Sequence, residues 1–168
     1  MAAGSTYSTI ETKSITGNPT SVTFTSIPST YTDLVVVISA ALSSTNDIGI
    51  RFNGDTGTNY SRTILYGTGS AAGSVTGGGA NQGQIEYYGT ADTTLGNSVI
   101  ILNVMNYSNT TTNKTVLCRS NNASLGVDAV VNLWRSTAAI NQIEFKPYTG
   151  AMTWVTGSTF TLYGIAAA

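Results

Sequence analysis

Short runs of alternating β-branched and aromatic residues, separated by Thr, Ser, Asn and Gly, extend over nearly the whole chain. In one of them Ile48, Ile50 and Phe52 share one side of an extended strand, and the residues between them share the other. A period of two residues is that of a half-buried β-strand rather than of an α-helix. The pattern therefore predicts an all-β protein.

Strands of this kind recur at intervals of about ten to fifteen residues, which is typical of β-sandwiches. The predicted strands are residues 7–15, 21–25, 33–41, 48–53, 60–66, 84–88, 98–106, 114–120, 129–134, 143–146 and 159–165. Residues 136–142 are the only hint of a helix. A chain of 168 residues suits one sandwich and is cramped for two. We predict a single-domain, two-sheet antiparallel β-sandwich, jelly-roll-like, over residues 1–168.

Three segments of this prediction have a distinct character. Residues 33–41 form the strongest apolar run, which indicates a strand buried on both faces. Residues 67–83 contain seven glycines among Ser, Ala and Thr, so we expect a long flexible or partner-ordered loop there. Residues 1–6 are expected to form a flexible N-terminal arm.

Charged side chains are unusually scarce. They make up 9% of the chain, and seven basic and eight acidic residues leave a net charge of −1. The basic residues are scattered singly, whereas nucleic-acid binding needs clustered Lys and Arg. No nucleic-acid partner is therefore expected. A free monomer with a near-neutral surface is poorly soluble. We therefore expect a homo-oligomer whose subunits cover much of one another's surface.

The chain lacks most of the side chains that enzymes use. It has no histidine, so neither a serine hydroxyl nor a cysteine thiol could be activated by a histidine base. Cys118 is the single cysteine, which excludes an intrachain disulfide and a cysteine-based zinc site. It lies in an apolar run and is expected to be buried. We predict no enzymatic activity, no catalytic residue, no cofactor and no metal.

Paired carboxylates are the remaining route to catalysis, because glycoside hydrolysis needs only Asp and Glu. Glu86 and Glu144 both lie in predicted strands and would have to face each other across a sugar-binding groove. The favoured interpretation is that they occupy ordinary outward positions on half-exposed strands. The acidic residues are Glu11, Asp33, Asp47, Asp55, Glu86, Asp92, Asp128 and Glu144.

Asp47, Asn53, Asp55 and Asn59 form an oxygen-rich group of the kind that binds calcium. Their spacing does not match a helix-loop-helix calcium site. Asn and Asp are also the residues that a tight turn at residues 53–55 requires. Turn formation is the favoured interpretation.

Aromatic residues allow two interpretations. The nine tyrosines can stack on sugars at a receptor-binding surface, or they can sit on half-buried sheet faces with the hydroxyl at the rim. The second interpretation is favoured. Trp134 and Trp154 are expected to be anchors of the core or of an interface. The longest apolar runs, residues 34–38 and 99–102, are too short to span a bilayer, and no secretory signal follows Met1.

Three segments are similar to small virion structural proteins of tailed bacteriophages. They are residues 50–61 (IRFNGDTGTNYS), residues 31–37 (YTDLVVV) and residues 157–165 (GSTFTLYGI). The resemblance implies a β-sandwich that assembles, commonly as a trimer, and it implies no catalytic residues. The expected location is the virion, after synthesis in the host cytoplasm.

Two placements in the virion compete. A capsid decoration (cement) protein would bind the major capsid protein between capsomers and stabilise the head. A tail fibre or receptor-binding tip would recognise a host-surface glycan or protein, and would carry a shaft before its β-domain. The strand pattern begins near Tyr7 without a heptad segment, which favours decoration. A carbohydrate-active depolymerase is the least favoured alternative.

Overall fold

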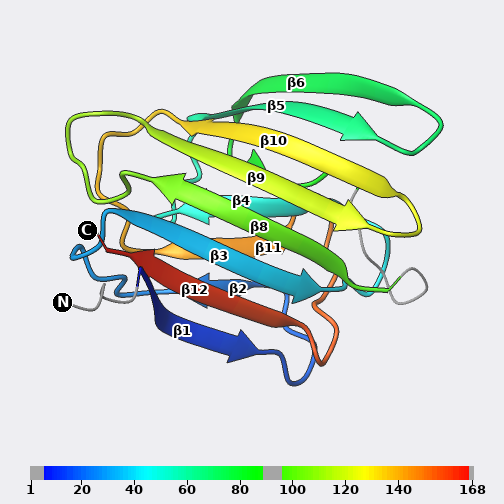
Figure 1. The fold of residues 1–168 in the computed structure, drawn as a ribbon, viewed down its shortest axis with the longest axis horizontal. Helices are drawn as coiled ribbons and strands as arrows, with labels where there is room; N and C mark the ends of the chain where they lie inside the picture. Colours follow the sequence, from blue (N-terminus) through cyan, green and yellow to red (C-terminus); the bar gives the residue numbers. More distant parts are fainter. Residues whose placement is uncertain (1–5, 89–95, 167–168) are drawn as a thin grey trace.

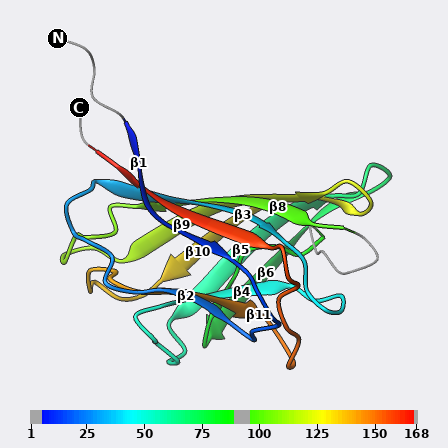
Figure 2. The same ribbon diagram turned by 90° about the horizontal axis from the view of Figure 1, so that it is seen from below.

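The computed structural model describes residues 6–88 and 96–166, which form two antiparallel β-sheets packed face to face (Figures 1 and 2). The large sheet has eight strands in the order β1-β12-β3-β8-β9-β10-β5-β6, and the small sheet has four in the order β2-β11-β4-β7. The strands are β1 (Tyr7–Ser14), β2 (Val22–Phe24), β3 (Asp33–Ala40), β4 (Ile48–Phe52), β5 (Tyr60–Gly67), β6 (Ala72–Ala80), β7 (Gly83–Gln84), β8 (Ser98–Met105), β9 (Lys114–Asn122), β10 (Gly126–Trp134), β11 (Ile143–Pro147) and β12 (Thr159–Ile165).

The predicted all-β, two-sheet sandwich is confirmed, and each predicted strand overlaps an observed one. Two details differ. The predicted strand at 84–88 keeps only Gln84 in β7, because the Tyr87 and Tyr88 amides donate to the Asp128 carboxylate instead of to a ladder. Residues 136–142 are not helical. Among the described residues, no helix is long and apolar enough to cross a membrane.

The chain passes repeatedly between the two sheets. β1, β3, β8 and β12 lie in the large sheet, and β2, β4, β7 and β11 lie in the small one. The hairpins β5–β6 and β9–β10 extend the large sheet beyond these four strands (Figure 1). The sheet order alone does not establish a jelly roll, and that part of the expectation stays a prediction.

The core lies between the sheets and is rich in aromatic side chains. Trp154 packs edge-on against Phe160, and Trp134 stacks on Tyr60. Both tryptophans are buried, as is Cys118. Their predicted place in the core is confirmed. The predicted alternation is confirmed in residues 48–52, where Ile48, Ile50 and Phe52 are buried.

The glycine-rich segment is a strand, so the loop expected over residues 67–83 is wrong. β6 pairs along its length with β5, and a short turn joins them through the Thr68 amide, which donates to the Ala71 carbonyl at 2.8 Å. The Tyr66 side chain of β5 lies across Gly73, where an added Cβ would come within 2.5 Å of the tyrosine hydroxyl. The partner strand thus supplies the cover that the glycines cannot supply themselves.

The expected N-terminal arm, residues 1–6, is described only at Thr6. Thr6 is exposed, and its carbonyl accepts a hydrogen bond from the Ala166 amide, while residues 1–5 lie outside the described residues.

In β3 the prediction of burial on both faces is confirmed at Val35, while Val37 on the same outward side is half-buried. The outward side of the large sheet therefore becomes more open away from β3.

Candidate functional site

The outward side of the large sheet carries large apolar side chains that none of the described residues covers. We call it the outer apolar face and define it by Leu65, Val99, Ile101, Met105, Leu117, Val127, Ala129 and Val131. Six of these residues, all except Ile101 and Ala129, are 40–57% exposed. They come from β5, β8, β9 and β10, whose inward side chains are buried against the small sheet. Exposed apolar surface that is contiguous marks an interaction site.

The ladder register shows how apolar and polar side chains are arranged on this face. Across β8, β9, β10 and β5, three successive rows are Asn103–Leu117–Val131–Thr63, Ile101–Arg119–Ala129–Leu65 and Val99–Asn121–Val127–Gly67. Directly opposed residues on one face of a sheet have Cβ atoms about 4.5–5.5 Å apart. Leu117 is therefore directly opposed to Val131, and Ala129 to Leu65. Arg119 and Asn121 of β9 stand between the apolar side chains of β8 and those of β10, so the face is apolar on both sides of these two polar residues.

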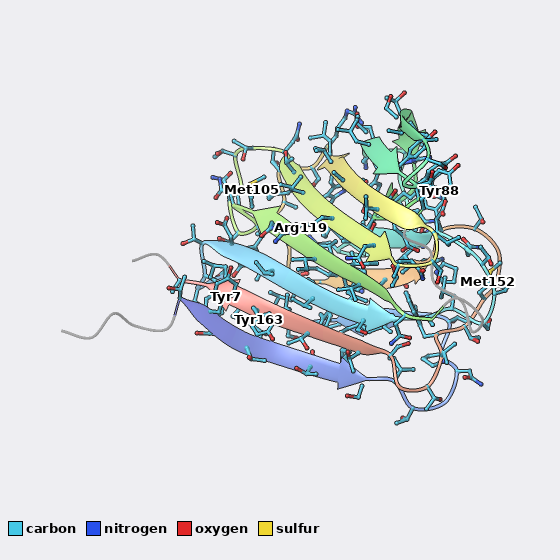
Figure 3. The ribbon with its side chains drawn as sticks, turned by 45° about the vertical axis from the view of Figure 1, so that its right-hand side comes forward. Tyr7, Tyr88, Met105, Arg119, Met152 and Tyr163 are labelled. Carbon is cyan, nitrogen blue, oxygen red and sulfur yellow. The ribbon has the colours of Figure 1, made fainter. Side chains whose placement is uncertain are left out.

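Arg119 is the only charged residue in these three rows and lies near the middle of the face on β9 (Figure 3). Two shallow depressions flank it. One is lined by Val99, Ile101 and Val127, and the other by Leu117 and Ala129. A guanidinium between two apolar depressions can donate a bidentate hydrogen bond to a carboxylate of a docked protein.

Glu86 and Asp128 are both buried between the sheets, and each has its own hydrogen-bond partners. Asp128 accepts hydrogen bonds from the Tyr87 amide at 2.8 Å and from the Ser120 hydroxyl at 3.1 Å. Glu86 accepts one from the Ser98 hydroxyl at 3.0 Å, and its other oxygen is buried without a donor among the described residues. Burial, reinforced by nearby acidic charges, raises the pKa of Glu86 well above its usual value. Glu86 therefore keeps its proton to a higher pH in the fold than in the unfolded chain.

Glu86 and Glu144, considered as a carboxylate pair, lie in different surroundings. Glu86 is fully buried, so the outward position expected for it is wrong, because it lies between the two sheets. Glu144 is half-buried on the outward side of β11 as expected, beside Arg51, with 3.8 Å between Oε2 and Nη1. Glu11 pairs with Lys13 at 2.7 Å. Asp92 lies outside the described residues. The groove considered between Glu86 and Glu144 has no counterpart in this arrangement.

In the oxygen-rich group considered for calcium, Asp55 and Asn59 are hydrogen-bonded to each other, whereas Asn53 and Asp47 bind other parts of the fold. Although burial alone would raise the pKa of Asp55, hydrogen bonds from Trp134, Asn59 and the Gly57 amide hold it below its usual value. The Asn53 side chain hydrogen-bonds to the backbone of residues 139–142. Asp47 accepts a hydrogen bond from the Gln84 side-chain amide at 2.6 Å. Among the described residues, no group of three or more Cys, Asp and Glu side chains is suited to a metal ion. The side chains of this group therefore stabilise the loop at residues 55–59 and the small sheet through hydrogen bonds within the fold.

Three tyrosines gather at the end of the β5–β6 hairpin. The ring of Tyr66 lies 4.6 Å from that of Tyr88 and 5.5 Å from that of Tyr87, centroid to centroid. All three are half-buried, as the favoured interpretation of the tyrosines predicts. Figure 3 labels Tyr88 and so shows where this cluster lies on the molecule.

The outer apolar face has a sequence signal that the strand prediction left unused. Neighbouring residues such as Val116 and Leu117, or Val130 and Val131, put apolar side chains on both sides of one strand. Such runs indicate burial on both faces, and the monomer covers one. No known protein-family model matches this chain, and no curated protein matches it either. The outer apolar face is therefore the feature from which a function can be inferred.

Proposed function

We propose that this protein is a non-enzymatic structural component of a tailed-bacteriophage virion, and specifically a capsid decoration protein that binds the major capsid protein between capsomers. The outer apolar face supports the proposal, because a monomer that leaves Leu65 and Val127 more than half exposed needs a protein to cover them. The resemblance of residues 50–61 to virion structural proteins supplies the biological setting.

The finer topology fits the same proposal. With the hairpins β5–β6 and β9–β10 set aside, the sheets read β1-β12-β3-β8 and β2-β11-β4-β7. We infer that this is a jelly roll of two Greek keys with two hairpins inserted in the large sheet, an architecture that viral capsid domains use. Fold likeness does not assign function by itself, so the proposal rests on the surface.

Docking would bury the outer apolar face and aim Arg119 at an acceptor on the shell. A homotrimer, the assembly that the resemblance implies, would present three such faces to neighbouring capsomers. Simultaneous engagement of linked sites strengthens binding without new contacts, through effective concentration. The function is therefore adhesion in the virion, achieved by repetition around the shell.

The internal chemistry agrees with a structural role. The carboxylate oxygens of Asp55 and Asp128 accept hydrogen bonds from other groups of the fold. Burial, with the nearby carboxylates, raises the pKa of the Cys118 thiol well above its usual value, which makes it a poor nucleophile. We propose no catalytic residue, cofactor or metal.

The test uses phage particles that lack this protein and purified protein added back. Val131→Lys puts a charge on the outer apolar face, and Thr23→Lys puts the same charge on the outward side of β2 as a control. We expect wild-type protein and Thr23→Lys to bind and to raise the temperature at which particles release DNA. Val131→Lys should bind at least about tenfold more weakly, a difference of about 1.4 kcal/mol. Equal binding by both variants, or equal heat resistance of bare and decorated particles, would contradict the proposal.

A receptor-binding tail tip is the second candidate, and the cluster of Tyr66, Tyr87 and Tyr88 favours it. Aromatic rings that remain half-exposed can stack on sugar faces. This candidate predicts that purified protein blocks phage adsorption and that Tyr88→Ala weakens the block. Copy number per virion separates the two candidates: a number comparable to that of the capsomers means decoration, and a number comparable to that of the tail fibres means a tail tip.

A further inference from the structure

The two sheets end in four edge strands that differ in how well they are protected against pairing with another chain. Protection comes from short length, charged side chains, proline or bulges. β2 and β7 are short, with three and two residues. β1 carries the Glu11–Lys13 ion pair and a register shift between Thr9 and Glu11. These three edges are therefore poor templates for a further strand.

β6 has little such protection. It is nine residues long, it contains no charged residue and no proline, and it is the last strand of the large sheet. Its pairing with β5 is regular from Ala72 to Gly77, and the register shifts only beyond that point. Ala72, Ser74 and Thr76 are exposed on the outward side. A regular, uncharged edge of this length offers unpaired backbone groups to an added strand.

We propose that β6 pairs in antiparallel fashion with β6 of a second copy of this chain, so that two large sheets become one across a two-fold axis. A two-fold contact uses the same patch on both subunits. Two copies of β6 are compatible as neighbours, because their pairing places no charge opposite a like charge and their largest side chains are those of Val75 and Thr76. The net charge of −1 also adds little repulsion between two copies.

The geometry of such a pair is compatible with the outer apolar face. Side chains alternate strictly between the two sides of a strand. An antiparallel two-fold contact that pairs outward residues with outward residues therefore keeps both outer apolar faces on the same side of the joined sheet. Two copies would then present a doubled docking surface in one direction. This addition does not depend on capsid docking, because pairing can be measured on the pure protein.

The pairing can be tested by charge reversal at Ser74 and Thr76. Both are exposed on the outward side of β6, so substitution should leave the fold intact. Every in-phase register centred on residues 74, 75 or 76 brings two of these positions opposite each other. Ser74→Lys/Thr76→Lys and Ser74→Glu/Thr76→Glu should each repel their own copies, since like charges directly opposite are destabilising. An equimolar mixture should pair again.

The measurement is molar mass by light scattering. Wild-type protein should have an even number of copies, two or a pair of trimers, and each charged variant should have half that mass. The mixture should return to the wild-type mass. Thr12→Lys/Ser14→Lys, exposed hydroxyl positions on the opposite edge strand β1, should keep the wild-type mass.

Three results would overturn the pairing: wild-type protein that stays a monomer or a trimer at the highest soluble concentration, a mixture that does not recover its mass, or the same loss of mass in the β1 control. Failure of capsid docking looks different. Val131→Lys should retain the wild-type mass whether or not it binds particles, so the two proposals fail separately.

Discussion

The two faces of the large sheet are built from the same strands and from similar residues, yet the described part of the chain covers only one of them. On β5, Ile64 is fully buried and its neighbour Leu65 is 57% exposed. On β10, Val130 is fully buried and Val131 is 44% exposed. The small sheet explains the difference, because its four strands pack on the inward side only. Apolar character therefore marks surfaces that are to be covered, by the chain itself or by a partner.

The largest expected effect separates these faces within one strand. Ile64→Ala removes a core side chain and should lower the free energy of unfolding by about 2–5 kcal/mol. Leu65→Ala removes a side chain that the monomer leaves exposed, and should change it by no more than about 0.5 kcal/mol. Urea denaturation of both variants measures the contrast. Similar losses in the two would mean that Leu65 is already covered in the isolated protein.

The next effect tests the buried acid on the inward side. The native pKa of Glu86 is raised above its ordinary value of 4.5, so the fold holds the proton that the unfolded chain loses. The stability that this group contributes is complete below about pH 4.5 and falls as the pH rises toward the native pKa. The fall is about 1.4 kcal/mol for each pH unit between the unfolded and native pKa values. Glu86→Gln should remove this slope.

Denaturation at a series of pH values measures it. Glu144→Gln, at a half-buried carboxyl on the outward side of β11, is the matched control and should keep the wild-type slope. A slope that survives in Glu86→Gln would show that another group causes it.

A smaller effect distinguishes the two sides of β6. An alanine Cβ at Gly73 would lie 2.5 Å from the Tyr66 hydroxyl oxygen, whereas at Gly78 the nearest atom is 3.8 Å away. Gly73→Ala should therefore lower the free energy of unfolding by about 1–3 kcal/mol, because Tyr66 must move off the strand. Gly78→Ala should cost much less. Thermal unfolding of the pair decides whether the tyrosine cover holds β6 in place.

The smallest effect on stability belongs to Arg119. Its side chain is exposed on the outer apolar face, so Arg119→Gln should change the free energy of unfolding by no more than about 0.5 kcal/mol. If the face docks on capsids, the same variant should bind bare particles more weakly than wild-type protein in a sedimentation assay. Unchanged binding would place the docking contact away from the centre of the face.

The sequence predicted the strands whose side chains alternate by themselves. Ile48, Ile50 and Phe52 point to the core as expected, and so do Trp134 and Cys118. β6 was missed because its glycines have no side chains to alternate, and its cover comes from Tyr66 on another strand. The burial of Glu86 was missed as well, because its surroundings, including the Ser98 hydroxyl that it accepts from, come from residues that the fold brings together.

By itself, the sequence determined an all-β chain with few charges, no histidine and a buried lone cysteine. These properties are local, because a period of two residues and a residue count do not depend on distant contacts. The tertiary structure decided which side of β8, β9, β10 and β5 stays open, and that β6 rather than β1 is the open edge. Those outcomes depend on how many strands each layer holds and on the order in which they pair, which are set by contacts between residues far apart in the chain.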